Sequence, residues 1–271
     1  MDWLVLIYDV GSKRIMSIGF FDSGLGGLTV LADSYKAMPH QDYLYIADTL
    51  HVPYGTKQAE DVKKYVLDAT SILAEQGIEA LVVACNTATS IAIKELRQQY
   101  HFPVIGMEPA VKPALEMSRR AGLRVLVFGT PLTLKQPKYH MLVSSIDDES
   151  LVDSMPLPEL VHYCESLVFD EDEMKQYFNN KLAGYDLNQY GTIVLGCTHY
   201  SYYRHILSQI VPTHIKIIDG NAGTVHRLSE VLGHPELHLS EHKGTVSLMC
   251  TNNDPKYIQK MHTAWKRLLE N

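Results

Sequence analysis

Short apolar segments alternate with longer amphipathic segments along most of the 271-residue chain. The apolar segments are continuously hydrophobic, which is typical of parallel strands covered on both faces. The expected strands span residues 16–22, 43–48, 80–85, 103–107, 124–129, 192–197, 215–219 and 245–250. Between them, helical periodicity is clearest over residues 58–76, 88–100, 157–168 and 254–269. This alternation predicts an α/β fold with doubly wound, mainly parallel sheets.

The chain also contains the same local pattern twice. A strand, a cysteine and a helix follow one another at 80–100 and again at 192–210. A strand, an aspartate and a small residue do so at 16–24 and at 215–223. The repetition predicts two pseudo-symmetric domains with an active-site cleft between them. Because ligands bind outside the carboxyl ends of strands in open α/β sheets, we expect function in the turns that end these strands.

The domain boundaries follow from this duplication, since no Gly/Ser-rich linker marks where the chain crosses. Residues 1–111 and 223–271 are assigned to the first domain and residues 112–222 to the second. The segment 144–158 is rich in Asp, Glu and Ser and contains two prolines, so it is expected to form a loop.

Composition narrows the functional classes. The net charge is −7 and no dense run of Lys or Arg is present, which argues against binding to nucleic acid or to an acidic membrane. The N-terminal apolar run WLVLIY is too short to span a membrane and lacks the features of a signal peptide. It is expected to be either an edge strand or an extension upstream of a start at Met16. The four cysteines lack metal-binding spacing, so we expect reduced thiols in a cytoplasmic protein and no metal site.

Two cysteines are the main chemical signal. Cys85 lies in VVACNTAT and Cys197 in VLGCTHYS, each after a buried-type strand. Each precedes a candidate helix N-cap, which is Asn86-Thr87 in the first turn and Thr198 in the second. A helix N-terminus favours thiolate over thiol. A matched pair of thiols on two lobes suits proton transfer at both faces of a small ligand better than nucleophilic catalysis, which needs one thiol.

The other two cysteines are weaker candidates. Cys164 lies inside the helical pattern LVHYCESL, where packing explains it well. Cys250 ends a strand whose following turn, TNNDP, has no counterpart in the other half of the chain.

Further polar residues fall in the turns or near them. Asp22-Ser23 opens the turn DSGLGG, which does not fit the dinucleotide pattern GxGxxG but can offer backbone N–H groups to a carboxylate. His199 is close enough to Cys197 in sequence to act as a proton donor or orienting group. Glu165 either supplies a second carboxylate or is an exposed helical residue. Tyr54-Gly55 forms a turn that lets a ligand approach the backbone.

Taken together, these segments resemble the signatures of bacterial glutamate racemases, within the aspartate/glutamate racemase superfamily. The resemblance starts near residue 16, continues to the C-terminal helix and rests on FDSGLGGLTV, ADTLHVPYG, VACNTAT, GMEPAV, FGTPLT and LGCTHY. It implies racemization of glutamate without pyridoxal phosphate, metal or any other cofactor. It also implies a homodimer in the cytoplasm that supplies D-glutamate for peptidoglycan synthesis.

The resemblance also implies residue roles. Cys85 would take the α-proton from D-glutamate and Cys197 from L-glutamate. Thiol-assisting groups would be Asp22, His199 and, through a looser match of PELVHYCE, Glu165. Substrate-binding residues would be Asp22, Ser23, Tyr54, Gly55, Asn86, Thr87, Thr198 and His199. Two departures are Ser201 and Tyr202, where the family usually has proline and an aliphatic residue. The serine lies beyond the reacting groups, so it bears on local pocket shape and regulation more than on activity.

Three alternatives stay open. One is an aspartate or other amino-acid racemase of the same superfamily. Another is a hydrolase with Cys197 as nucleophile and His199 as base, which we rank low because residues two apart on a turn rarely face each other. The last is a binding module that kept the cleft without chemistry, against which the presence of both thiols argues.

Overall fold

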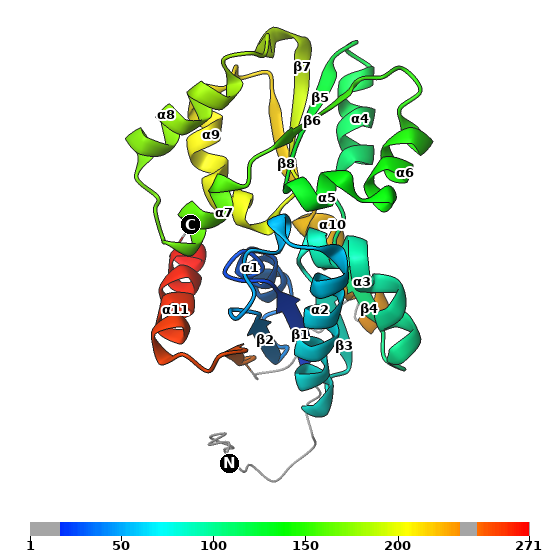
Figure 1. Cartoon of the computed structure of the whole chain (residues 1–271), viewed down its shortest axis with the longest axis vertical. Helices are drawn as coiled ribbons and strands as arrows, with labels where there is room; N and C mark the ends of the chain where they lie inside the picture. The colour runs from blue at the N-terminus through cyan, green and yellow to red at the C-terminus, as the bar shows by residue number, and fades with distance from the viewer. Residues whose placement is uncertain (1–16, 234–242, 271) are drawn as a thin grey trace.

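The computed structural model describes residues 17–233 and 243–270 of the chain. Two lobes lie one above the other, each built around its own parallel sheet (Figure 1). The first lobe contains a five-stranded sheet in the order β4-β3-β1-β2-β9. Its strands are β1 (Ile18–Asp22), β2 (Tyr43–Ala47), β3 (Ala80–Val83), β4 (Val104–Gly106) and β9 (Val246–Cys250).

The second lobe contains a four-stranded sheet in the order β6-β5-β7-β8. Its strands are β5 (Arg124–Gly129), β6 (Val152–Pro156), β7 (Tyr190–Leu195) and β8 (Lys216–Asp219). All strand pairs in both sheets are parallel. The predicted α/β class with parallel sheets is therefore confirmed, and every expected strand overlaps an observed one.

Helices cover both faces of each sheet, as doubly wound connections require. They are α1 (Leu28–Ala37), α2 (Ala59–Glu75), α3 (Asn86–Gln99), α4 (Val111–Arg119), α5 (Pro131–Lys135), α6 (Pro137–Ile146), α7 (Glu159–Glu165), α8 (Glu171–Leu182), α9 (Arg204–Ile210), α10 (Asn221–Leu232) and α11 (Pro255–Glu270). Three short 3₁₀ helices complete the set: η1 (Tyr54–Thr56), η2 (Leu187–Gln189) and η3 (Thr198–Tyr203).

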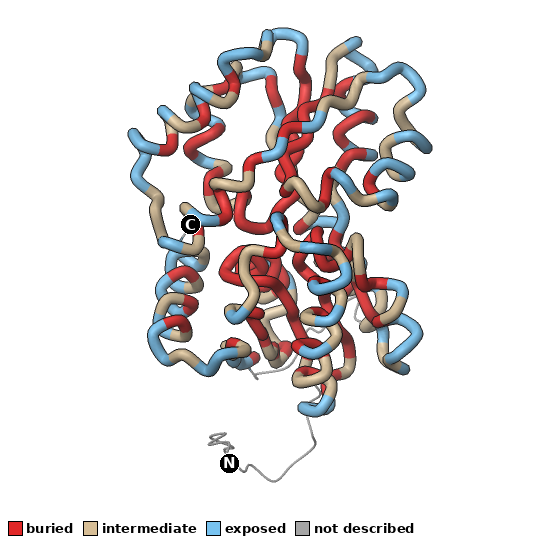
Figure 2. Tube along the Cα trace, in the orientation of Figure 1, coloured by how far each residue is buried: buried red, intermediate tan, exposed pale blue. Residues whose placement is uncertain are grey.

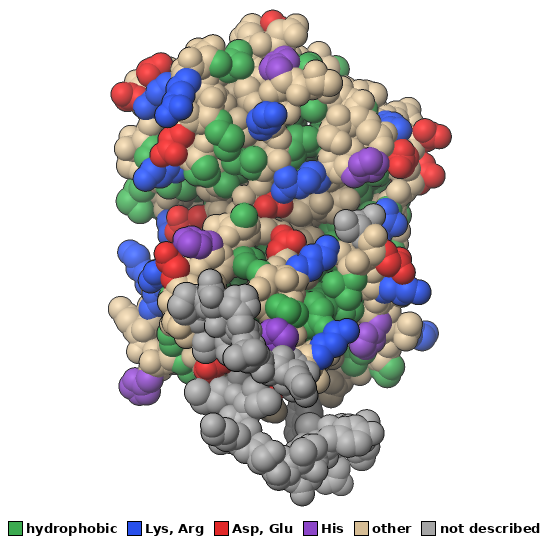
Figure 3. Space-filling model, turned by 180° about the vertical axis from the view of Figure 1, so that it is seen from behind, with side chains coloured by type: hydrophobic (Ala, Val, Ile, Leu, Met, Phe, Trp, Pro, Cys, Tyr) green, Lys and Arg blue, Asp and Glu red, His purple; other side chains and the backbone are tan. Residues whose placement is uncertain are grey.

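The core explains why the apolar segments form the central strands. All residues of β1 and β3 are buried, and the tube coloured by burial shows the buried positions concentrated on the strands and the inner helix faces (Figure 2). Strands covered on both faces by helices have no solvent-facing side, so their sequences do not alternate. On the face opposite to Figure 1, basic and acidic side chains are interspersed (Figure 3).

The chain passes between the sheets after β4 and again after β8. After the second crossing, α10 packs against α1 of the first lobe. The domain boundaries assigned from the sequence remain a prediction, and residues 1–16 lie outside the described part of the chain. Over the described ranges, no helix is long and apolar enough to cross a membrane.

One expectation is wrong, because the segment 144–158 is not a loop. It contains the end of α6 and the whole of β6, which pairs in parallel with β5. The strand is polar because it lies at the edge of its sheet, where polar side chains find lateral partners. Asp153 accepts hydrogen bonds from Arg124 and from the Tyr190 hydroxyl at 2.7 Å each. An apolar-run criterion misses such a strand.

Candidate active site

The carboxyl ends of the two sheets face each other, and the turns that follow β1, β3 and β7 enclose a small cavity. It is lined by Ser23, Tyr54, Gly55, Cys85, Asn86, Thr87, Thr130, Val161, Cys197, Thr198 and His199. Its volume is about 10 Å³, roughly what one water molecule needs. Nine of these lining residues were predicted from the sequence, whereas Thr130 and Val161 were not. A larger groove of about 1100 Å³ lies where the chain crosses between the lobes, and neither thiol lines it.

Cys85 sits at the start of α3, where it is itself the N-cap. Its sulfur accepts a hydrogen bond from the Ala88 backbone N–H at 3.4 Å and lies 3.8 Å from the Ser23 hydroxyl. The expectation that Asn86-Thr87 would cap this helix is therefore wrong. Burial, followed by the charge of Asp22, raises the pKa of the Cys85 thiol to about 12. Cys85 thus keeps its proton at neutral pH in this closed arrangement.

Cys197 lies at the start of the short helix η3 and faces His199. Its sulfur is 3.7 Å from His199 Nδ1, and His199 Nε2 is 2.7 Å from Glu165 Oε1. The expectation that residues 197 and 199 would not face each other is wrong, because the tight 3₁₀ turn brings the imidazole back over the sulfur. The sequence left open whether Glu165 is an exposed helical residue. In the structure its side chain is largely buried at the lobe interface.

The His199–Glu165 pair is an imidazolium beside a carboxylate. Burial alone would lower the pKa of His199, but its hydrogen bonds to Cys197 and Glu165 and their charges raise that pKa well above the usual value. Burial would likewise raise the pKa of Glu165, but His199, the Tyr257 hydroxyl and the Leu25 N–H lower it. A positively charged group therefore lies next to the Cys197 sulfur, whereas the hydrogen-bond partners of the Cys85 sulfur among the described residues, the Ser23 hydroxyl and the Ala88 N–H, are uncharged.

Asp22 is fully buried and links the two lobes. It accepts hydrogen bonds from the Gly24 N–H at 3.0 Å and from the Thr198 hydroxyl of the second lobe at 3.1 Å. Burial raises the pKa of Asp22, and the nearby charge of His199 opposes that rise. Asp22 does not line the cavity, but its charge contributes to the raised pKa of Cys85.

Asn86 marks where a ligand could bind. Within the described part of the chain, both its side-chain oxygen and nitrogen are buried without a hydrogen-bond partner, although the residue lines the cavity. An unpaired buried amide is costly, so such a group at a cavity wall is suited to bind a polar ligand. Beside it, the Thr87 hydroxyl contacts those of Thr130 and Thr133 at 3.0 and 2.8 Å.

Tyr54 and Gly55 close the cavity on the side of the first lobe. The Tyr54 hydroxyl donates to the buried Asp48 carboxylate, which fixes the turn. A Cβ at Gly55 would lie 2.6 Å from Thr130 Cβ of the second lobe, so only glycine allows this close approach. Thr130 was not predicted from the sequence, although a threonine directly before a proline in a turn that ends a strand is a recognisable helix N-cap. Thr130 indeed caps α5 directly before Pro131.

The two departures from the family pattern lie outside the cavity. The Ser201 hydroxyl donates to Asp219 Oδ2 at 2.8 Å, at the end of β8. The Tyr202 hydroxyl donates to the Leu25 backbone carbonyl at 3.2 Å, across the lobe interface. Tyr202 therefore acts on how the lobes meet, whereas the Ser201 contact lies within the second lobe. Among the described residues, no group of three or more His, Cys, Asp or Glu side chains is arranged to hold a metal ion.

Comparisons with known proteins identify the family. Residues 29–228 match the Asp/Glu/Hydantoin racemase family. Glutamate racemase of Halothermothrix orenii is 54% identical over 217 residues, which are 80% of this chain and 85% of the relative. Glutamate racemase 2 of Bacillus subtilis is 46% identical over 256 residues, which are 94% of this chain and 96% of the relative.

Solved structures show the same fold. The crystal structure of glutamate racemase isoform RacE1 from Bacillus anthracis has a TM-score of 0.82 at 26% identity and covers 94% of this chain and 95% of its own. The Escherichia coli glutamate racemase, solved with L-glutamate and the activator UDP-MurNAc-ala, has a TM-score of 0.80 at 26% identity. That match covers 93% of this chain and 95% of the relative.

The close contact of Gly26 with Thr198 and His199 of the second lobe is expected to keep the cavity closed to reagents. In a Gly26→Ala variant, the new Cβ would overlap the Thr198 hydroxyl and lie 2.7 Å from the His199 backbone nitrogen, so it would push the lobes apart. We expect Cys85 and Cys197 to react about tenfold faster with a small alkylating reagent, because overpacking of this kind costs on the order of 1–3 kcal/mol. Gly223→Ala is the control, since a Cβ there meets nothing within 4 Å. Equal rates in wild type and Gly26→Ala would contradict the expectation.

Proposed function

The chain belongs to the Asp/Glu/Hydantoin racemase family, and we propose that it is a glutamate racemase that interconverts L-glutamate and D-glutamate. The observation that carries this proposal is that Cys85 of the first lobe and Cys197 of the second line one cavity. Inversion at a carbon requires a proton to leave one face and another to arrive at the opposite face. Two acid/base groups, one on each side, meet that requirement.

In the proposed reaction, the Cys197 thiolate removes the α-proton of L-glutamate. The Cys85 thiol then donates its proton to the opposite face of the carbanion, so D-glutamate leaves with Cys197 protonated and Cys85 ionised. The reverse reaction, or exchange of the thiol protons with solvent after D-glutamate leaves, restores the starting protonation. Two features support this direction: burial raises the pKa of Cys85 to about 12, so Cys85 holds a proton to donate, and the Cys197 sulfur lies 3.7 Å from His199 Nδ1.

Polar groups around the cavity would bind the substrate. We propose that the amide of Asn86, both of whose polar atoms lack partners within the described ranges, hydrogen-bonds a carboxylate of glutamate. The full proposed set is Asp22, Ser23, Tyr54, Gly55, Asn86, Thr87, Thr198 and His199. Asp22, His199 and Glu165 would in addition assist the thiols. Hydrogen bonds and fixed charges in a site closed to water would stabilise the carbanion.

Substrate entry would require the lobes to separate. Glutamate is much larger than the present cavity of about 10 Å³. The turns that bound it belong to different lobes, so opening at the crossings would admit the substrate, and closure around it would exclude water.

The remaining parts of the proposal rest on the family. We propose that the reaction needs no pyridoxal phosphate, metal or other cofactor, because thiols and fixed charges suffice for proton transfer. The enzyme would act in the cytoplasm of a bacterium and supply D-glutamate for peptidoglycan synthesis. It would do so as a homodimer.

Two other activities compete with this proposal. Aspartate has the same functional groups on a shorter side chain, so a related racemase could use it with the same thiols. The contact between Cys197 and His199 also fits a hydrolase nucleophile and its base, but such a mechanism leaves Cys85 without a role.

Replacing either thiol tests the two-base mechanism. We expect Cys85→Ser and Cys197→Ser each to lower racemization of L-glutamate and of D-glutamate by at least roughly 100-fold, since serine is too weak an acid and base to replace a thiol. Circular dichroism of the substrate follows the reaction. Cys250→Ser is the matched control, because Cys250 is also buried but lies outside the cavity. Full turnover of Cys85→Ser in both directions would rule out the two-base assignment.

A substrate panel tests the choice of glutamate. We expect racemization of glutamate to exceed that of aspartate and alanine by at least roughly 100-fold in kcat/KM, because a missing methylene or carboxylate leaves polar groups of the site unpaired. The measurement is a parallel assay of the three L-amino acids at equal enzyme concentration. Faster turnover of aspartate would transfer the proposal to the related racemase.

A further inference from the structure

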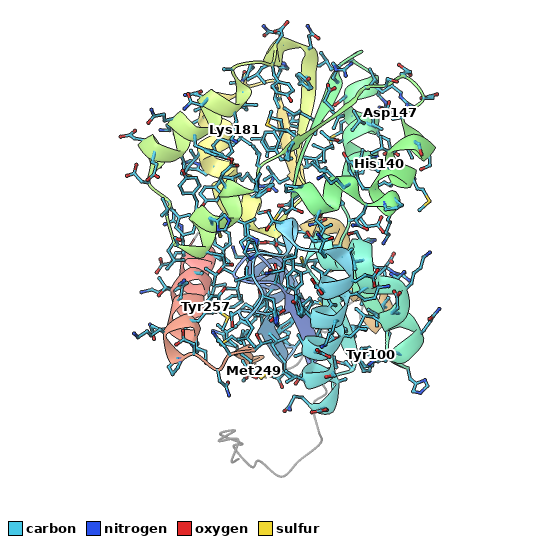
Figure 4. All side chains as sticks on the ribbon, viewed as in Figure 1. Tyr100, His140, Asp147, Lys181, Met249 and Tyr257 are labelled. Atoms are coloured by element: carbon cyan, nitrogen blue, oxygen red, sulfur yellow. The ribbon has the colours of Figure 1, made fainter. Side chains whose placement is uncertain are left out.

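The C-terminal helix α11 reaches the acid/base residues from the first lobe. It follows β9 and runs along the side of the first lobe up to the segment that connects α7 and α8 (Figure 1). Tyr257, labelled in Figure 4, lies on its first turns and is buried. The helix therefore brings side chains from near the end of the chain to Glu165, which belongs to the second lobe.

Glu165 is held by donors on both of its carboxylate oxygens. Oε1 accepts from the Leu25 backbone N–H at 2.7 Å and faces His199 Nε2 at the same distance. Oε2 accepts from the Tyr257 hydroxyl at 2.6 Å. The Lys260 ammonium donates to the Glu165 backbone carbonyl at 2.8 Å, so α11 fixes both ends of this residue.

Tyr257 is suited to remain a donor. Burial, followed by the charge of Glu165, raises the pKa of its hydroxyl well above the usual range, so it keeps its proton. A carboxylate buried at this depth stays ionised only if its oxygens receive hydrogen bonds. If Oε2 lost its donor, the pKa of Glu165 would rise, so the proton of the pair would shift from His199 toward Glu165 and the positive charge beside Cys197 would weaken.

We propose that Tyr257 is a positioning residue of the active site, whose hydroxyl keeps Glu165 ionised and directed at His199. This inference rests on the proposed racemization, and it assigns the C-terminal helix to the half of the mechanism that uses Cys197. Cys85 has no such chain of groups, since among the described residues its sulfur is hydrogen-bonded only to the Ser23 hydroxyl and the Ala88 N–H.

The same contacts link protonation to lobe closure. Leu25 and Tyr257 belong to the first lobe, whereas Glu165 and His199 belong to the second. Opening of the lobes would separate Glu165 from both donors, and closure would restore them. The charged pair next to Cys197 would therefore be complete only when the substrate is enclosed.

Tyr257→Phe tests the proposal, because it removes one hydroxyl and leaves the ring. We expect kcat for racemization of L-glutamate to fall by roughly tenfold or more with little change in KM, as for loss of a hydrogen bond to a charged group. We also expect the ¹⁵N resonances of the His199 imidazole at neutral pH to shift from imidazolium toward neutral imidazole. His199→Asn assigns these resonances by their absence.

Tyr43→Phe is the matched control. Tyr43 is a buried tyrosine of the first lobe whose hydroxyl donates to the backbone carbonyls of Ser34 and Met38, away from Glu165. It should affect stability without changing kcat or the His199 resonances. An unchanged imidazolium signal in folded Tyr257→Phe would overturn the proposal, whatever the activity.

Lys260→Met provides the test if Tyr257→Phe does not fold. It removes the ammonium that holds the Glu165 backbone while keeping an apolar chain, so the same changes are expected with smaller size. An unchanged His199 signal in this variant would then overturn the proposal. The resonances are measured without substrate, so they test the role of Tyr257 even if the wild-type protein does not racemize glutamate. Absence of racemization by the wild-type protein would refute the proposed function instead.

Discussion

The fold depends on one constraint: the polar turns that end the strands of two sheets must be buried against each other. Such a contact is stable only if the buried polar groups find partners in the opposite lobe. Asp22 accepts a hydrogen bond from the Thr198 hydroxyl, and Glu165 accepts hydrogen bonds from the Leu25 N–H and the Tyr257 hydroxyl. Glycines at 26 and 55 remove the side chains that would keep the lobes apart. The cavity between the thiols exists because these cross-lobe contacts surround it.

The two thiols occupy chemically different surroundings. The Cys85 sulfur accepts a hydrogen bond from a backbone N–H and lies near the charge of Asp22. Its pKa is raised to about 12, chiefly by burial. Cys197 lies 3.7 Å from an imidazole whose pKa is raised by Cys197 and Glu165. A racemase needs one thiol and one thiolate at the start of each turnover. In the proposed reaction, the enzyme form that accepts L-glutamate has Cys85 as the thiol and Cys197 as the thiolate. Proton transfer to and from the substrate then exchanges these two roles.

Much of this arrangement follows from local sequence. Continuous apolar runs predicted the central strands, and the duplicated strand–cysteine turns predicted residues that the fold brings to one cavity. The strand at 152–156 was missed because its polar side chains pair laterally at a sheet edge. Tyr257 was missed because its partner Glu165 is 92 residues away and no local pattern links them. The facing of Cys197 and His199 depends on the 3₁₀ geometry of their turn, which residue spacing does not reveal.

The central claim is that a proton leaves one face of glutamate and a different proton arrives at the other. Incubation of L-glutamate with the protein in D₂O tests it most directly, with Cα deuteration followed by NMR and optical rotation followed in parallel. We predict that D-glutamate forms with deuterium at Cα and that the rotation decays to zero. Retention of the rotation by substrate-saturated protein, or formation of D-glutamate that keeps its original α-hydrogen, would contradict it.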